Sequence, residues 1–205
     1  MRTTMLVAAA GTVALVACAK GKEYNDSASG VADTTKATMT PAPAPAPATA
    51  PLTDANIGAL LDEANAGDSA TGKLASTKGT KADVKAYGVL MMKDHHALRV
   101  LGLNLVKKLS ITPTPPANDS LPTKVKSAQD NLNAMDKGAA WDKAYIDGEV
   151  ATHQMVLSLI DAAQSAAQAP EMKDLLTKAR PNIEMHLKRA QDIRTKLTAD
   201  ATSKY

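Results

Sequence analysis

The sequence predicts an all-α domain that begins near Thr53, and three observations support this prediction. The chain contains no Phe and only one Trp, and its part after residue 52 is rich in Ala, Leu, Lys, Asp and Gln, a composition that favours helices over sheets. Apolar residues recur there with the 3.6-residue period of amphipathic helices. Residues that commonly start helices, such as Thr53 and Pro170, precede the periodic segments. We therefore expect residues 53–205 to form one helical domain.

Two long helices are expected in the first half of this domain. The first begins at the cap Thr53 and ends at Lys78-Gly79. The second is capped by Thr80 and continues to about Leu109. Because the connection between them is short, the two helices should form an antiparallel pair.

A short helix and two more long helices are expected in the second half. Residues 110–119, SITPTPPAND, are predicted to form a loop because their prolines disrupt a helix. A short helix over about 124–136 then leads to a long helix that carries Trp141 to Ile160, and Pro170 starts the last one. Two short turns, with a long crossover between the second and third long helices, predict an up-down four-helix bundle of the ferritin-like kind.

The first 52 residues have a different character. Residues 1–17 contain one cation, Arg2, and an apolar run too short for a permanent membrane span, a pattern typical of an export signal peptide. The segment ends in LVAC, which resembles the lipobox of bacterial lipoproteins and predicts cleavage before Cys18 and lipidation of its thiol. Alternatively, Cys18 lies inside a signal peptide that is cleaved further along. Residues 18–52, with the run TPAPAPAPATAP, are expected to form a disordered, semi-stiff Pro/Ala-rich tether.

Cysteine usage and charge indicate which partners to expect. Cys18 is the only cysteine, so a disulfide does not explain its presence in an exported protein. Lipidation predicts that the membrane is a partner through Cys18, and Ala19 after the cysteine favours the outer membrane, with the domain facing the periplasm of the cell envelope. The formal net charge of +3 comes from interspersed charges without a clustered basic face, so no nucleic-acid partner is expected.

Titratable residues interrupt the apolar faces of all four long helices. At 100° per residue, Asp68, His95 and His186 lie at the centres of their faces, and Glu149 and His153 lie one turn apart within the apolar arc of the third long helix. At a rise of about 1.5 Å per residue, the three histidines are predicted to lie at nearly the same height. Asp68 is predicted to lie about one helical turn closer to the end of the bundle.

Three histidines in one buried layer predict either a metal site or a polar network. A divalent ion would satisfy three acceptor nitrogens at once, with Asp68 or Glu149 completing the shell, and these ligand types suit Zn, Fe, Mn or Cu. Alternatively, the same residues form a metal-free network that fixes the register of the helices. Asp94 is expected either to orient a neighbouring histidine or to be solvated. His96 is expected to be a partly exposed residue on the flank of its helix.

The segments MMKDHHALRVLGLNL, WDKAYIDGEVATHQMVLSLI and ARPNIEMHLKRAQDI resemble the bacterial family catalogued as predicted outer membrane proteins with a ferritin-like domain of unknown function. The resemblance covers about residues 53–198 and implies a helical bundle in the cell envelope without an established activity. The wider ferritin-like superfamily implies a di-iron site with two lone carboxylates and two Glu-x-x-His motifs. Met92 and Ile183 stand three residues before His95 and His186, so both motif glutamates are missing and one metal ion, or none, is expected.

The sequence offers no clear sign of catalysis. It contains no recognisable nucleophile–base arrangement, phosphate-cradling glycine loop or paired acid/base carboxylates. Two functions therefore remain open: a lipid-anchored envelope protein whose bundle binds one metal ion, and a non-catalytic interaction module whose polar layer only sets helix register. A divergent oxidase is a third and weaker alternative.

Overall fold

The computed structural model describes residues 51–202, which contain five α-helices and no β-strand. The helices are α1 (Asp54–Lys78), α2 (Ala82–Lys108), α3 (Leu121–Ala134), α4 (Ala139–Ala166) and α5 (Pro170–Thr202). The predicted all-α class is therefore confirmed. None of these helices is both long enough and apolar enough to cross a bilayer. Cys18, the expected signal peptide and almost all of the expected tether lie outside the described residues.

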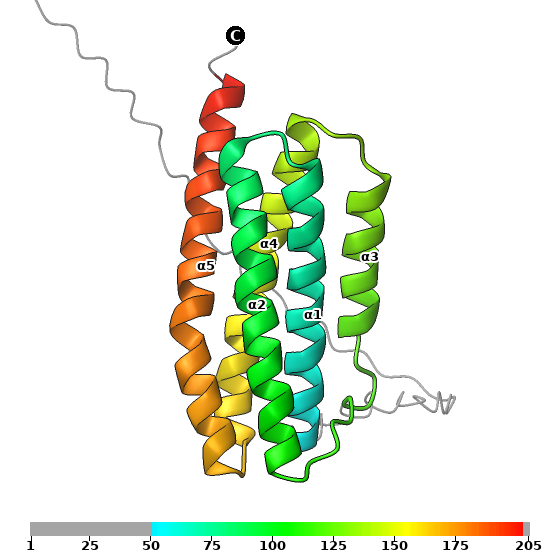
Figure 1. The fold of residues 1–205 in the computed structure, drawn as a ribbon, viewed down its shortest axis with the longest axis vertical. Helices are drawn as coiled ribbons and strands as arrows, with labels where there is room; N and C mark the ends of the chain where they lie inside the picture. Colours follow the sequence, from blue (N-terminus) through cyan, green and yellow to red (C-terminus); the bar gives the residue numbers. More distant parts are fainter. Residues whose placement is uncertain (1–50, 203–205) are drawn as a thin grey trace, which may run out of the picture. The chain divides into compact units, whose positions relative to one another are not determined.

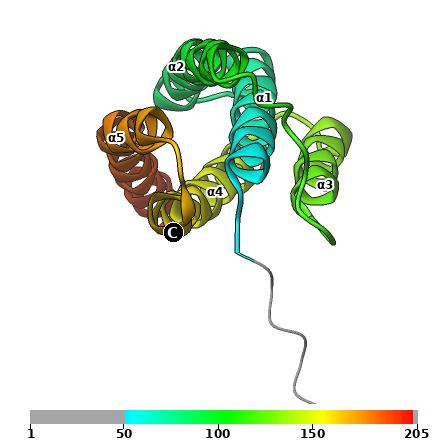
Figure 2. The ribbon, with the colours of Figure 1, turned by 90° about the horizontal axis from the view of Figure 1, so that it is seen from below.

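Four of the helices form the bundle, and the fifth lies outside it. Figure 1 shows that α1 and α5 run in one direction while α2 and α4 run in the opposite direction. Seen along the bundle in Figure 2, α1, α2, α5 and α4 follow one another around a square, and α3 lies on the outside against α1 and α4. The chain thus contains the predicted long crossover between the second and third long helices, with α3 inside the crossover.

Local hydrogen bonds explain where two of the helices begin. The Thr53 hydroxyl accepts from the Asn56 N–H and the Asn56 carboxamide accepts from the Thr53 N–H, so a reciprocal capping box starts α1 as predicted. Helix α3 begins three residues earlier than predicted, at Leu121. The Asp119 carboxylate accepts from the Leu121 N–H, and Pro122 is tolerated because it lies in the first turn.

The predicted cap at Thr80 is wrong, and the reason is a contact with another helix. Lys81 is the residue that precedes α2, and its side chain makes no capping bond. The Thr80 hydroxyl instead donates to the buried carboxylate of Asp142 on α4, which also accepts from the N–H groups of Thr80 and Lys81 at 2.8 and 2.9 Å. A carboxylate from the opposite helix pair therefore binds the α1–α2 turn.

A matching contact holds the other short turn. The Asp54 carboxylate on α1 accepts from the N–H groups of Gln168 and Ala169, both at 2.9 Å, in the turn between α4 and α5. Each helix pair therefore supplies one carboxylate that binds the turn of the other pair, at opposite ends of the bundle. Because both contacts satisfy backbone donors that helix termini leave unpaired, they fix how far the two pairs slide past each other.

Helices α1 and α2 approach closely at two glycines. A Cβ atom added to Gly72 would lie 2.7 Å from the carbonyl oxygen of Gly88, and one added to Gly88 would lie 2.6 Å from the carbonyl oxygen of Gly72. Any side chain at either position would force the two backbones apart. This close contact lies between the short α1–α2 turn and the centre of the bundle, so it helps to set where the middle of each helix faces.

The apolar core is divided into two clusters. The first cluster contains Ile57, Leu60, Ala64, Val106, Leu121, Val156, Ile160, Ala163, Ala167, Met172, Leu176 and Ile183. The second contains Ala75, Val84, Tyr87, Met91, Leu132, Trp141, Tyr145, Ile146, Val150, Ala190 and Ile193. Along every bundle helix, the buried residues between the two clusters are polar apart from two glycines of α1: Asn65, Asp68 and Thr71, His95, His153 and His186. The core therefore contains one polar layer with apolar packing on both sides.

We predict that Asp142→Asn lowers the free energy of unfolding by about 2–4 kcal/mol, because one of three donors would face an amide N–H₂ group instead of an acceptor. Urea unfolding followed by circular dichroism measures the loss. Asp147→Asn on the same helix is the matched control, since Asp147 only pairs with the exposed Lys143 side chain and should cost well under about 1 kcal/mol. Equal losses for the two variants would mean that the Asp142 contact does not hold the turn.

Candidate metal centre

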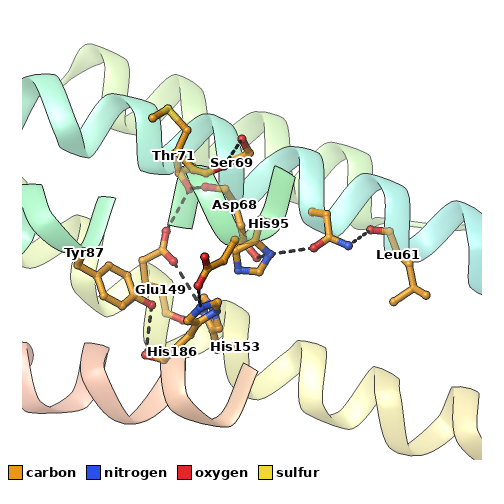
Figure 3. A network of polar contacts seen from close by, with 12 residues as sticks. Leu61, Asp68, Ser69, Thr71, Tyr87, His95, Glu149, His153 and His186 are labelled. Carbon is orange, nitrogen blue, oxygen red and sulfur yellow. Dashed lines mark hydrogen bonds and ion pairs between the residues drawn. The ribbon is translucent and has the colours of Figure 1, made fainter. Parts of the chain in front are cut away.

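Three histidines from three different helices meet in the polar layer. His95 lies on α2, His153 on α4 and His186 on α5, and their relative exposures are 1%, 0% and 0%. The ring centroids are 5.4 Å apart for His95 and His153, 5.1 Å for His95 and His186, and 5.5 Å for His153 and His186. Figure 3 shows these side chains together with Asp68 and Glu149. The structure thus brings the three predicted histidines to one height.

One nitrogen of each ring donates to an acceptor. His153 Nδ1 lies 2.8 Å from the backbone oxygen of Glu149, and His186 Nε2 lies 3.1 Å from Asp94 Oδ2. A carbonyl or carboxylate oxygen can only accept, so these two ring nitrogens carry the proton. The contacts therefore fix the tautomers of His153 and His186.

The third ring is fixed by an asparagine. His95 Nδ1 lies 2.9 Å from Asn65 Oδ1, while Asn65 Nδ2 donates to the Leu61 carbonyl oxygen at 2.7 Å. Because the amide nitrogen is used by Leu61, the Asn65 oxygen must face the ring, and His95 Nδ1 is the donor. Asn65 is a site residue that the sequence analysis missed. Its signal was available: Asn65 precedes Asp68 by three residues on the inward face of α1.

The second nitrogen of each ring is buried without a partner. His95 Nε2, His153 Nε2 and His186 Nδ1 make no hydrogen bond within residues 51–202. One ring nitrogen of each histidine lies within 4.8 Å of the other two. Given the tautomers above, the unpartnered nitrogens each carry a lone pair. Three buried acceptors without a donor are costly, and a single cation between them would satisfy all three.

The three free ring nitrogens are not protonated at neutral pH. Burial lowers the pKa of His95 well below 6.5, and the neighbouring rings of His153 and His186 lower it further. Burial also lowers the pKa of His153 to about 4, against a raising effect of its bond to the Glu149 backbone. Burial lowers the pKa of His186 as well, although the Asp94 carboxylate opposes the shift. All three rings are therefore neutral, which is the form that binds metal ions.

Asp68 and Glu149 lie beside the rings but outside the group of metal-ligating atoms. Asp68 Oδ2 lies 3.6 Å from His95 Nδ1, and Glu149 Oε2 lies 3.7 Å from His153 Nδ1. Both carboxylates thus approach the nitrogen that already donates, not the one with the lone pair. The candidate group of ligand atoms among the described residues consists of the three histidines alone.

The two carboxylates form a buried acidic pair. Burial raises the pKa of Asp68 from 3.8 to about 7 and the pKa of Glu149 well above 4.5, and the charge of Asp68 raises the pKa of Glu149 further. The Thr71 hydroxyl donates to Glu149 Oε1 at 3.0 Å, and the Tyr145 hydroxyl also lies beside the Glu149 carboxylate, where both hydroxyls oppose the rise of its pKa.

The last two residues considered in the sequence are Asp94, which contacts a ring of the layer, and His96, which does not. Asp94 is partly exposed and accepts from His186, so its carboxylate lies where an outer partner of a metal-bound histidine would lie. His96, its neighbour along the chain, is exposed and is absent from the group of ligand atoms. The adjacent pair His95-His96 thus places one ring in the centre and the other in solvent.

Comparison with known proteins adds a family but no activity. A family model described as a domain of unknown function (DUF4142) matches residues 38–193. The chain belongs to this family. No curated protein and no solved structure matches the chain. The DUF4142 region contains the whole polar layer, from Asn65 to His186.

The layer of this DUF4142 domain does not reproduce the donor set that the ferritin-like superfamily implies. Met92 and Ile183 occupy the positions three residues before His95 and His186, and Ile183 is buried in the apolar core. Neither position offers a carboxylate, so the bridging glutamates of a two-metal site are missing. The three histidines provide donors for one ion.

We predict that Asp68→Asn stabilises the metal-free protein at alkaline pH. The raised pKa of Asp68 means that its protonated form stabilises the fold, fully below about pH 4, and that this contribution is lost as the pH rises through about 7. Asparagine stays neutral, so the free energy of unfolding of the variant relative to the wild type should increase between about pH 5 and pH 8.5, by about 1.4 kcal/mol for each pKa unit.

Urea unfolding at both pH values, with a chelator present, measures this difference. Asp130→Asn is the control, because Asp130 pairs with Lys126 on the exposed face of α3 and contributes little at either pH. If the gap between Asp68→Asn and the wild type is the same at both pH values, Asp68 is not held in its protonated form.

Proposed function

We propose that this protein binds one divalent metal ion in the centre of its bundle through His95, His153 and His186. The observation that carries this proposal is the set of three buried ring nitrogens that have lone pairs and no donor. Each of the three rings also has its other nitrogen bonded to an acceptor, which is the usual arrangement around metal-bound histidines.

The donor set favours zinc, copper or iron over manganese. Three imidazoles suit Zn, Cu and Fe, whereas Mn prefers carboxylate and carbonyl oxygens. One nitrogen of each ring lies within 4.8 Å of those of the other two, close enough for one ion to reach all three. A cavity of about 30 Å³ adjoins His95, Asn65 and Asp68 on one side of the three histidines.

The alternative function is that of an interaction module with a metal-free polar network. Such a network would be expected to pair its buried polar atoms, because each one left without a partner costs free energy. Here the three histidine nitrogens, Asp68 Oδ2 and Glu149 Oε2 are all unpartnered within the described residues. This number of buried polar atoms without a hydrogen-bond partner favours a cation-binding site over a closed hydrogen-bond network.

We predict that the purified, untagged protein binds close to one equivalent of metal, and that His95→Gln or His153→Gln removes it. The adjacent histidine provides the matched control, since His96→Gln changes an exposed ring and should leave the metal content unchanged. Elemental analysis after dialysis, with circular dichroism to confirm folding, gives the stoichiometry. A metal-free wild type whose melting temperature ignores added Zn, Fe, Mn and Cu would support the interaction module instead.

We also propose that the domain is anchored in the cell envelope through a lipid on Cys18, with the outer membrane as its site. The support is the LVAC sequence after an apolar segment, the absence of any second cysteine, and the Pro/Ala-rich run that follows.

We predict that Cys18→Ser abolishes lipidation, so that the protein either leaves the membrane fraction or keeps its signal peptide. Membrane fractionation, gel mobility and mass spectrometry of the N-terminal peptide distinguish these results. A Ser27→Ala variant, which changes the expected tether, is the control and should behave like the wild type. A Cys18→Ser protein with the mobility and membrane association of its parent would contradict the anchor.

A further inference from the structure

A second cavity lies on the outer side of the polar layer, between α1, α3 and α4. Its volume is about 240 Å³, larger than the roughly 150 Å³ that suffices for an apolar cavity to bind benzene. Much of its wall is apolar and comes from residues such as Leu121, Val125, Leu132 and Met155. The cavity can therefore hold a small organic molecule.

The inner end of this cavity is acidic. Asp68, Thr71, Tyr145 and Glu149 line it, and the two carboxylates are each 4% exposed. Asp68 Oδ2 and Glu149 Oε2 are buried without a hydrogen-bond partner in the described chain, at 3.6 and 3.7 Å from the donor nitrogens of His95 and His153, and the Tyr145 hydroxyl lies beside Glu149. The one basic residue in the lining, Lys124, is exposed and makes no ion pair with the residues described. The acidic end thus lacks a cation of its own.

We propose that this cavity binds a small organic cation with a primary ammonium head and a short apolar tail. An ammonium group has three N–H donors, and the acidic end offers oxygens of two carboxylates and two hydroxyls as acceptors. A tail of a few carbons would pack against Val125 and Met155, so the ligand matches both ends of the cavity.

A divalent metal ion fits this cavity less well. Mg²⁺ and Ca²⁺ require six or more oxygen ligands, and the acidic end offers two carboxylates and two hydroxyls beside an apolar wall. An organic ammonium ion needs fewer oxygen ligands than either metal ion, and its tail covers the apolar wall.

The position of α3 supports binding from the outside. This helix forms the outer wall of the cavity and lies outside the four-helix bundle (Figure 2). Its last turn is held by Lys78, whose ammonium donates to the carbonyl oxygens of Leu132, Asn133 and Met135 at 2.7–3.0 Å. Val125 packs directly on Gly67, where an added Cβ atom would lie 2.9 Å away. Opening α3 would therefore expose the cavity without separating the bundle helices.

Calorimetric titration of the purified full-length protein with n-butylammonium chloride tests the proposal. A chelator is present throughout, so that the outcome does not depend on metal at the histidines. We expect saturable binding near one equivalent, and 1-butanol, which has the same tail without the charge, should bind at least about tenfold more weakly. Equal binding of the two probes, no binding of butylammonium, or its displacement by stoichiometric Mg²⁺ would each overturn the proposal.

Two kinds of variant locate the site. Glu149→Gln removes one acidic charge at nearly constant shape and should weaken butylammonium binding at least about tenfold, whereas the exposed Glu184→Gln should not. Val125→Phe fills the apolar part and should block the tail while the charge remains. Circular dichroism confirms folding of each variant. Unchanged binding in both Glu149→Gln and Val125→Phe would contradict the assigned cavity. If a variant does not fold, the comparison of butylammonium with 1-butanol on the wild type still tests whether the ligand must be a cation.

Discussion

The constraint on which this structure depends is the burial of three neutral imidazoles at one height. Each ring has a donor and an acceptor nitrogen, and burial leaves no water to satisfy either one. The donors are satisfied by Asn65, by the Glu149 backbone and by Asp94, which belong to three different helices. The ring centroids lie only 5.1–5.5 Å apart. The layer therefore requires all four bundle helices to be in register to within a fraction of a helical turn.

The rest of the fold provides that register. The layer lies between two apolar clusters, each of which draws residues from all four bundle helices, so packing on both sides resists sliding. At the two ends, Asp142 and Asp54 bind the backbone of the opposite turn. A hydrogen bond from a backbone amide to a carboxylate has a narrow range of lengths. Apolar contacts, in contrast, tolerate small shifts. The contacts at the two ends of the bundle thus fix the height at which the helices meet in the polar layer.

Sequence periodicity was sufficient to predict the helices and the layer because both depend on regular geometry. A helix has a constant rise, and short turns start neighbouring helices at the same end, so counting residues from those turns placed His95, His153 and His186 together. The predicted start of α3 was three residues late although its cap, Asp119, is local in sequence, whereas the start of α2 was misplaced because Asp142 on α4 binds the turn before it. Such contacts depend on how helices meet, which a single-helix pattern does not contain.

The same limit explains what was missed at the site itself. Periodicity indicates that a side chain points inward, but not which of its atoms finds a partner. The role of Asn65 depends on its amide being used by the Leu61 carbonyl, and the acidic cavity depends on where α3 crosses α1 and α4. The sequence therefore predicted Asp68 and Glu149 as possible metal ligands, while the structure places them beside the donor nitrogens of the rings.

That placement puts a carboxylate near each of the three imidazoles. Each imidazole has one carboxylate near its protonated nitrogen: Asp68 at 3.6 Å for His95, Glu149 at 3.7 Å for His153 and Asp94 at 3.1 Å for His186. A dication held by three neutral ligands would place uncompensated charge in a medium of low dielectric constant, where it is costly. Among the three carboxylates only Asp94 accepts a hydrogen bond from its ring, so it would supply opposite charge without occupying a coordination position and would make the free nitrogen of His186 a better ligand.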